Sequence, residues 1–435
     1  MRPRITPQTG WSLGVHGGQI VSRRAFVRQS TALAASGVVG LGLRHGIAQA
    51  ADSLRRSGKA CILLWMQGGP SQFETLSPKP NHANGGETRA IPTSVPGIEI
   101  ADNLPETARV MEHLCLLRTL TGKEGSHPRA SHLMQTGYLP AASVKFPALG
   151  AHVAYHLGEP DFDLPSFIHI GRSGQVARGG FLGLDYDPFL ITSATRPPDN
   201  TELATARPRF RRRLQLMEQL EQDYAKDGAK AIVENHRKLY KKASRMVLSS
   251  RMKTFDIEKE PSASRSAYGD GDMAAAFLLA RRLVEAGVPF VEINLGNWDT
   301  HNDNFERTRN LCGQLDRPWA QLLRDLNDRG LLDRTLVVWT GEFGRTPRIN
   351  PRGGRDHFPR AFAAALAGCG IRGGQVIGKT DPSGNAIEDR PIEIPQFFRT
   401  IYRALGIDAD HEYVSNVGRP IKVADDGEPI TEAFG

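Results

Sequence analysis

Three short polar clusters carry the carboxylates and imidazoles that could do chemistry in this sequence. They are Asp299 with His301, Glu342 with Arg345, and Asp356 with His357. Carboxylate oxygen favours hard cations of the Ca/Mg class, whereas imidazole nitrogen favours zinc-like ions. Asp356 beside His357 is either a pair of metal ligands or a carboxylate that orients an imidazole. Each cluster alone is more typical of a loop hydrogen-bond network, but three clusters at one edge of a sheet indicate a shared divalent metal site.

A fourth cluster runs from Glu124 to His132. Ser126 is either a nucleophile activated by His127 or only the N-cap of the helix that follows, and the sequence leaves both open. A hydroxyl at a helix N-terminus lies where backbone N–H groups favour anions. Arg129 or Arg345 is the candidate clamp on such an anion.

The elements that must position these clusters are alternating strands and helices. Predicted strands cover 59–66, 113–120, 288–295 and 335–340; predicted helices run from near Ala130 to 137, over 273–286 and over 310–329. This alternation predicts an α/β fold with a doubly wound, mostly parallel sheet. Functional crevices in such sheets lie beyond the carboxyl ends of the strands, which is where the clusters fall.

Residues 140–264 differ in composition and are predicted to be a helical and loop insertion. Residues 172–200 are rich in Gly and Pro, and 209–253 have the apolar spacing of a long amphipathic helix or helix pair. The arginines of 209–213 are interpreted as a solvated helix face in preference to a partner-binding arm, because acidic residues follow just downstream.

The N-terminal residues predict export. Arg23 and Arg24 precede an apolar run over 31–43 that is too short to span a bilayer, and small residues follow at Ala48 and Ala50. Residues 1–50 are therefore assigned to a twin-arginine signal peptide and 51–435 to the folded α/β domain. The expected location is the periplasm or the exterior of the cell.

The charge, hydropathy and cysteine content argue against nucleic-acid binding, a membrane anchor and disulfide bonds. Residues 1–50 hold six of the 55 basic residues and no acidic ones, which leaves 49 basic against 47 acidic residues. This balance does not indicate nucleic-acid binding, and no later apolar stretch is long enough for a membrane anchor. The four cysteines form no C-x-x-C pair and are expected to be buried free thiols rather than disulfides.

Several motifs together carry a resemblance to a known family. They are residues 67–71 (QGGPS), 126–129 (SHPR) with 136–140 (TGYLP), 298–301 (WDTH), 341–347 (GEFGRTP) and 354–359 (GRDHFP). The chain resembles a large family of exported bacterial proteins of unknown function within the alkaline phosphatase-like, or sulfatase-like, superfamily. The resemblance covers essentially the whole chain and implies an alkaline phosphatase-like sheet.

The resemblance also implies metal-assisted hydrolysis of phosphate or sulfate esters. Asp299, His301 and His357 resemble the ligands of one superfamily metal. At the second metal, Gln67 stands where a carboxylate is expected, and Glu342 with Phe343 replaces an Asp-His pair. An amide is a poor ligand and a phenyl ring is none, so the second site is expected to be degraded or absent.

Two functions from different classes follow. The first is a metal-dependent hydrolase acting on a small-molecule or polysaccharide ester. In it Ser126 is the nucleophile or anion anchor, and Asp299, His301 and His357 are metal ligands. Glu342 and Asp356 are further ligands or supports for ligands. The second is a non-catalytic binding protein for anionic or polysaccharide ligands that retains the fold. Gln67 and Phe343 favour the second.

Replacing both Arg23 and Arg24 with Lys should leave uncleaved precursor in the cytoplasm, because the export receptor recognises paired guanidinium groups. Cell fractionation and immunoblotting measure the precursor. Efficient export of the double variant, or a mature N-terminus far from Ala51, would contradict the assignment.

Overall fold

The computed structural model describes residues 13–16, 19–22, 51–172, 176–224 and 230–435. The chain divides into two compact units, Met1–Arg56 and Ser57–Gly435. In the first unit, β1 (Leu13–His16) and β2 (Gln19–Ser22) form an antiparallel hairpin. Arg23, Arg24 and residues 48–50, on which the export prediction depends, lie outside the described residues.

The second unit is built on a nine-stranded sheet. Its strands, in spatial order, are β14 (Gln375–Ile377), β6 (Leu114–Thr121), β13 (Phe362–Ala367), β10 (Thr335–Thr340), β3 (Ala60–Met66), β9 (Phe290–Leu295), β7 (Phe167–Ile170) and β8 (Phe189–Ile191), and β17 (Ile392–Glu393) pairs with β6. β13 is antiparallel to β6 and β10, whereas the other pairings in this sheet are parallel. The predicted α/β class with a mostly parallel sheet is confirmed.

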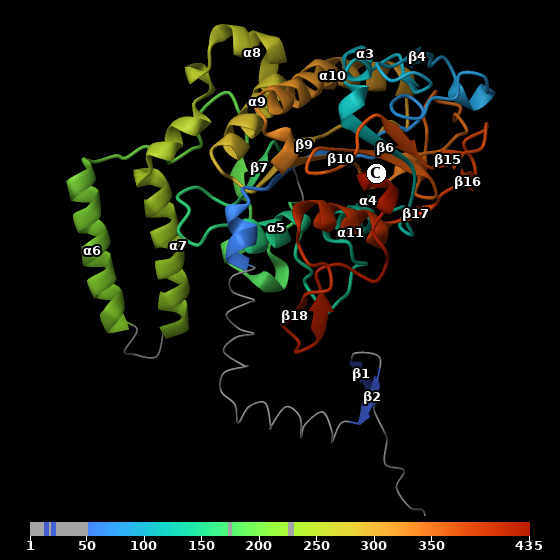
Figure 1. Cartoon of the computed structure of the whole chain (residues 1–435). Coiled ribbons are helices and arrows are strands. Elements are labelled where there is room, and N and C mark those ends of the chain that lie inside the picture. The colour runs from blue at the N-terminus through green and yellow to red at the C-terminus, as the bar shows by residue number, and fades with distance from the viewer. Residues whose placement is uncertain (1–12, 17–18, 23–50, 173–175, 225–229) are drawn as a thin grey trace, which may run out of the picture. The chain divides into compact units, whose positions relative to one another are not determined.

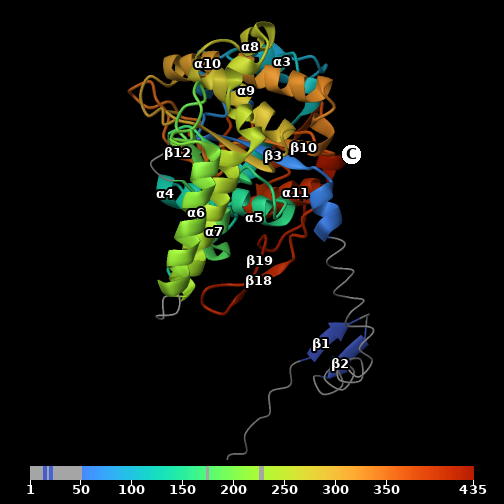
Figure 2. The ribbon, with the colours of Figure 1, turned by 90° about the vertical axis from the view of Figure 1, so that its left-hand side faces the viewer.

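Helices cover both faces of the sheet (Figure 1). On one face lie α3 (Pro105–Ala108), α8 (Ser262–Tyr268), α9 (Gly271–Glu285) and α10 (Asn304–Asp328); on the other lie α4 (His127–Thr136), α5 (Leu149–Leu157) and α11 (Ile394–Leu405). Figure 2 shows the same division from the side. Every residue of β3 and β10 is buried, as expected for central strands covered on both faces.

Most predicted elements agree with the structure to within a few residues. The strand predicted over 335–340 is β10 itself, whereas the helix predicted over 310–329 begins earlier, at Asn304. Asp303, just before α10, has a left-handed φ of 49°, so the chain turns sharply into the helix there. All four cysteines are buried and free, which confirms that expectation.

The segment predicted as an insertion divides into two parts. β7 and β8 extend the sheet beside β9, so this part of 140–264 is integral to it. Of the two alternatives predicted for 209–253, one long helix or a helix pair, the structure shows the pair: α6 (Arg207–Tyr224) and α7 (Lys230–Leu248) pack against each other. In the described part of the chain, no helix has the length and hydropathy needed to cross a bilayer.

The strand directions bring the polar clusters to one edge of the sheet. The loops that follow β3, β6, β9 and β10 all leave from the carboxyl end of a parallel strand. β13 runs the other way, so the residues that precede it, including His357, lie at this same edge. A two-stranded ladder of β11 (Gly344–Arg345) and β12 (His357–Phe358) pairs Arg345 with His357.

A buried ion pair joins the loop after β3 to the loop before β13. The guanidinium of Arg355 lies 2.7 Å from Glu74 Oε1, and both side chains are fully buried. Arg355 also donates to the carbonyl oxygens of Thr346 and Asn84. The Glu74 carboxylate is therefore not free to act as a metal ligand or a base, because it is paired with Arg355 away from solvent.

Glu74→Ala should lower the free energy of unfolding by about 3–5 kcal/mol, because it leaves the Arg355 charge buried and unpaired. Urea unfolding of the mature protein measures the change. Glu87→Ala is the matched control, since Glu87 pairs with Arg309 at 3.5 Å on the surface and such pairs contribute at most about 1 kcal/mol. Equal effects of the two substitutions would show that the buried pair is not a stabilising constraint.

Candidate metal centre

Three imidazoles surround the carboxylate of Asp299. His301 Nε2 lies 3.1 Å from Asp299 Oδ1, and His357 Nε2 lies 3.4 Å from the same oxygen. His127 Nε2 lies 3.4 Å from the other oxygen, Oδ2. One potential ligand atom from each of His127, Asp299 and His357 lies within 4.8 Å of the others. Side chains from the loops after β6 and β9 and from the segment before β13 therefore meet at one point.

The opposite nitrogen of each ring is held by an acceptor. His127 Nδ1 lies 2.7 Å from Glu342 Oε1, and His301 Nδ1 lies 2.9 Å from Asp356 Oδ1. His357 Nδ1 lies 2.8 Å from the carbonyl oxygen of Gly125. A carboxylate or a carbonyl only accepts, so each neutral ring places its proton on Nδ1 and leaves a lone pair on Nε2.

These tautomers direct unshared electron pairs into the same space. His301 Nε2 and His357 Nε2 lie only 2.9 Å apart. Two acceptor nitrogens at that distance repel each other unless a cation lies between them, either a proton or a metal ion. His127 Nε2 is also buried and makes no hydrogen bond within the described residues. The donor set of three imidazoles and one carboxylate has the composition of a zinc-type site.

Arg345 holds the carboxylate of Asp299 in position. Its guanidinium is fully buried, and one terminal nitrogen lies 2.6 Å from Asp299 Oδ1. The same nitrogen, Nη2, also donates to the carbonyl oxygens of Gly68 and Trp298. Nε and Nη1 donate to the carbonyl oxygens of Gly69 and Arg355. Arg345 was expected as a clamp on a bound anion; its buried position and these partners favour a positioning role instead.

The charges of the site shift several pKa values. Burial opposes ionisation of Asp299, but the hydrogen bond and charge of Arg345 lower its pKa to about 2. The hydrogen bond to Glu342 raises the pKa of His127 above its usual range. Burial lowers the pKa of His357. Asp299 is therefore ionised and His357 favours its neutral, ligating form near neutral pH.

Phe343 forms the apolar wall of the site. It is buried, and its ring centroid lies 4.3 Å from that of His357 and 4.9 Å from that of His127. A β-carbon on Gly69 would come within 2.6 Å of the Phe343 ring, and Gly69 has a φ of 76°. Gln67, which stands where a carboxylate was expected, accepts a hydrogen bond from Asn294 at 3.2 Å.

Gly68 is a contributor that the sequence did not single out. Its N–H donates to both oxygens of Glu342, at 3.0 and 3.2 Å, and so orients the carboxylate that holds His127. A β-carbon there would lie 2.4 Å from the backbone nitrogen of Asp299. The two consecutive glycines directly after a buried strand are the signal that could have indicated such close approach.

Ser126 and Arg129 lie at the entrance to α4. Ser126 is the exposed N-cap residue, but its hydroxyl makes no capping hydrogen bond to the helix. Both ring nitrogens of His127 face carboxylates, so Ser126 and His127 do not form a dyad. Arg129 is exposed and forms two hydrogen bonds with Glu124, at 2.6 and 2.8 Å. Of the residues predicted for the site, these two are exposed and make no hydrogen bond or ion pair with the candidate ligands among the described residues.

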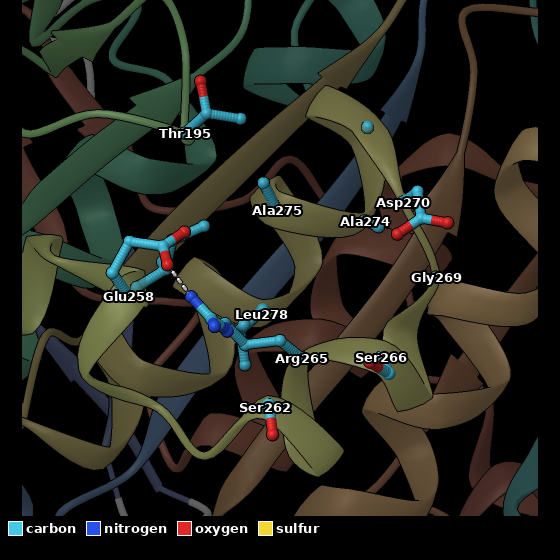
Figure 3. Close-up of a pocket in the computed structure, with 12 residues that line it drawn as sticks. Thr195, Glu258, Ser262, Arg265, Ser266, Gly269, Asp270, Ala274, Ala275 and Leu278 are labelled. Carbon is cyan, nitrogen blue, oxygen red and sulfur yellow. Dashed lines mark ion pairs between the residues drawn. The ribbon is translucent and has the colours of Figure 1, made fainter.

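Two cavities lie apart from the ring of imidazoles. One, of about 190 Å³, runs along α4 and includes Ser131, His132 and Gln135 in its lining. The other, of about 350 Å³, lies beside α8 and α9 (Figure 3). In it Arg265 reaches toward Glu258 and the two form an ion pair, and Asp270 is the other charged residue of the lining.

The family model described as "Protein of unknown function (DUF1501)" matches residues 58–434, and the chain belongs to this family. None of the curated proteins matches the chain.

Several solved structures are similar to the chain at low identity. The PsFucS1 sulfatase from Pseudoalteromonas sp. is 13% identical, with 82% of this chain and 72% of that chain covered and a TM-score of 0.39. The phosphonate monoester hydrolase of Agrobacterium radiobacter is 11% identical, with 86% and 77% covered and a TM-score of 0.38. A protein in the alkaline phosphatase superfamily from Vibrio parahaemolyticus is 10% identical, with 81% and 67% covered and a TM-score of 0.35.

In metal-free protein, the pKa of His127 should lie above about 6.5 and that of His357 below it. NMR titration of the ring protons measures both. Glu342→Gln should bring the pKa of His127 down while leaving that of His357 little changed. Because the folded-state pKa of His127 is raised, its contribution to stability is fully present below about pH 6.5 and is lost as pH rises through the folded-state value. An unshifted His127 would contradict the hydrogen bond to Glu342.

Proposed function

We propose that this site binds a single divalent metal ion of the zinc class. The observation that carries the proposal is the 2.9 Å separation of His301 Nε2 and His357 Nε2, two nitrogens whose rings are both held with their lone pairs inward. Asp299, His301, His357 and His127 are the proposed ligands. Glu342 and Asp356, expected as ligands or as supports, support His127 and His301 through their Nδ1 atoms.

The spacing of the donor atoms supports a small ion. Ligands that lie about 2.0–2.1 Å from zinc in tetrahedral geometry lie about 3.3 Å from one another. The separations from Asp299 oxygens to the three Nε2 atoms are 3.1, 3.4 and 3.4 Å. Calcium prefers six to eight oxygen ligands at longer distances, which a donor set dominated by imidazole does not supply.

A single ion is favoured over two. The amide of Gln67 is engaged by Asn294, and Phe343 offers no ligand atom. Arg345, with its charge directed at Asp299, occupies the space behind the carboxylate.

We further propose that the site hydrolyses phosphate or sulfate esters of a small molecule or polysaccharide, in an exported protein. A bound metal ion supplies Lewis acidity and lowers the pKa of bound water. The exposed hydroxyl of Ser126 lies at the N-terminus of α4, where helix N–H groups favour an anion or an alkoxide, and it has no capping bond to break. Arg129, in the first turn of the same helix, is the proposed partner of that anion once the arginine is released from Glu124.

The second candidate is an anionic or polysaccharide ligand bound without hydrolysis. Two features favour it. The four proposed ligands would close a tetrahedral site that a catalytic metal usually keeps open. The guanidinium of Arg345 is already hydrogen-bonded to the protein.

Elemental analysis of the purified mature protein should find about one zinc-class ion per chain. Alanine at Asp299, His301 or His357 should each weaken metal binding by more than the roughly 10–100-fold typical of residues that only support a ligand. Asp303→Asn, an exposed carboxylate change in the same loop, is the matched control and should retain the metal. Wild-type protein that binds no divalent ion would overturn the proposed centre.

Ser126→Ala should abolish turnover of aryl phosphate or aryl sulfate while the metal is retained, because the nucleophile or anion anchor is lost. Ser131→Ala, five residues further along in α4, should keep wild-type turnover. Retained turnover in Ser126→Ala would remove Ser126 from the mechanism. A metal-loaded wild type that hydrolyses neither ester would leave the binding function in its place.

A further inference from the structure

The hairpin of α6 and α7 is strongly basic, unlike the rest of the mature chain. Between residues 207 and 248 the sequence has 12 Lys and Arg against five Asp and Glu. The remaining residues after 50 have 37 basic against 42 acidic ones. The small net charge of the mature chain therefore conceals two regions of opposite sign.

The same hairpin exposes large apolar side chains. Leu216 and Leu220 on α6 are 52% and 74% exposed, and Leu239 and Tyr240 on α7 are 45% and 44% exposed. Leu216 and Leu220 are four residues apart, so they lie on one face of the helix. Exposed arginines at 209 and 211–213 precede them on α6. α6 thus carries a basic stretch followed by an apolar stripe, a combination that a merely solvated helix does not need.

α7 fixes the hairpin to the rest of its unit. Lys242 Nζ donates to the carbonyl oxygen of Asp185 at 2.6 Å, and Arg245 lies 3.1 Å from Asp161. Between the helices, Arg237 lies 3.2 Å from Glu221 and donates to the carbonyl oxygen of Glu218. In Figures 1 and 2, α6 lies alongside α7, and in Figure 1 it is the outer helix of the pair. The contacts of α7 therefore fix the position of α6, and the basic and apolar side chains of α6 do not pack against the sheet.

We propose that the α6–α7 hairpin binds the surface of a lipid bilayer that contains anionic phospholipid. Helices bind such interfaces when cationic side chains meet the headgroups and neighbouring Leu or aromatic side chains enter the acyl boundary. Each Lys or Arg near an anionic surface adds to the attraction, and the effect falls off within a Debye length. Both components are present on this hairpin, and the acidic remainder of the chain is repelled from the same surface.

Two other possible ligands of the hairpin, a soluble polyanion and a second copy of the chain, explain fewer of its features. A soluble polyanion would match the arginines but leaves the exposed leucines without a role. A second copy of the chain offers acidic surface, yet its other large exposed apolar residues are scattered over several elements: Leu139, Leu184, Leu190, Val414 and Val417. The bilayer alone matches the charge and the apolar stripe together.

Sedimentation with lipid vesicles tests the proposal on the mature protein. Wild type should co-sediment with phosphatidylcholine vesicles containing about a third phosphatidylglycerol and not with pure phosphatidylcholine vesicles, because the first step is electrostatic. Raising the salt concentration should weaken binding. Two variants should each reduce partitioning into anionic vesicles by about tenfold or more. One combines Leu216→Ser with Leu220→Ser, and the other has glutamate in place of the arginines at 211, 212 and 213.

Matched controls separate the hairpin from general surface effects. Val414→Ser with Val417→Ser changes two equally exposed apolar residues, and glutamate at Arg89, Arg334 and Arg419 makes the same charge change elsewhere; both should partition like wild type. Circular dichroism checks that every variant is folded.

Three results would overturn the proposal. The first is that wild type does not bind anionic vesicles. The second is that the leucine variant still binds and heparin competes the binding away, which indicates a soluble polyanion as the ligand. The third is that the protein self-associates without lipid and the hairpin variants abolish this, which indicates a second copy of the chain. None of these measurements involves metal binding or ester hydrolysis, so the outcome is independent of the function proposed above.

Discussion

The buried guanidinium of Arg345 is the interaction on which the candidate centre depends. It donates to carbonyl oxygens in the loops after β3 and β9 and in the segment before β12, and it also holds the carboxylate of Asp299. A planar group with five donors in fixed directions can join several chain segments at once, which a lysine cannot do. These hydrogen bonds are buried, so losing the guanidinium would remove a donor from each of these carbonyl oxygens where water does not readily replace it. The position of Asp299 is thus determined by the packing of loops far apart in the sequence.

The chemistry of the site follows from the hydrogen bonds behind the imidazoles. Glu342, Asp356 and the carbonyl oxygen of Gly125 each fix one ring with its Nε2 atom toward Asp299. Phe343 lies against two of these rings and gives one side of the site an apolar wall. Phe343 therefore contributes packing rather than a ligand atom to the candidate centre.

The candidate metal centre and the hairpin proposed to bind a bilayer use separate parts of the fold. The candidate centre lies at the carboxyl edge of the sheet, where loops of fixed geometry converge. The basic hairpin instead depends on exposed side chains along α6, and its helices are joined to the unit through a few polar contacts of α7. The two can be altered independently, since no described residue of the hairpin is among the candidate ligands.

The sequence by itself determined the elements and the residues capable of chemistry. Strong apolar runs ended by glycine predicted β3 and β10, and amphipathic spacing predicted either one long helix or the pair now seen as α6 and α7. The predictions of these elements are confirmed because apolar runs and helix periodicity are local properties of the sequence. The residue types at Asp299, His301 and His357 pointed to a metal site, which stays a prediction. The roles of individual side chains were decided only by the tertiary structure. Glu74 and Arg345 are as polar in sequence as any ligand, but burial pairs the first with Arg355 and turns the second onto backbone carbonyls. His127, adjacent to Ser126 along the chain, faces Asp299 and Glu342 instead, because contacts across a sheet edge depend on strand order and direction rather than on distance in sequence.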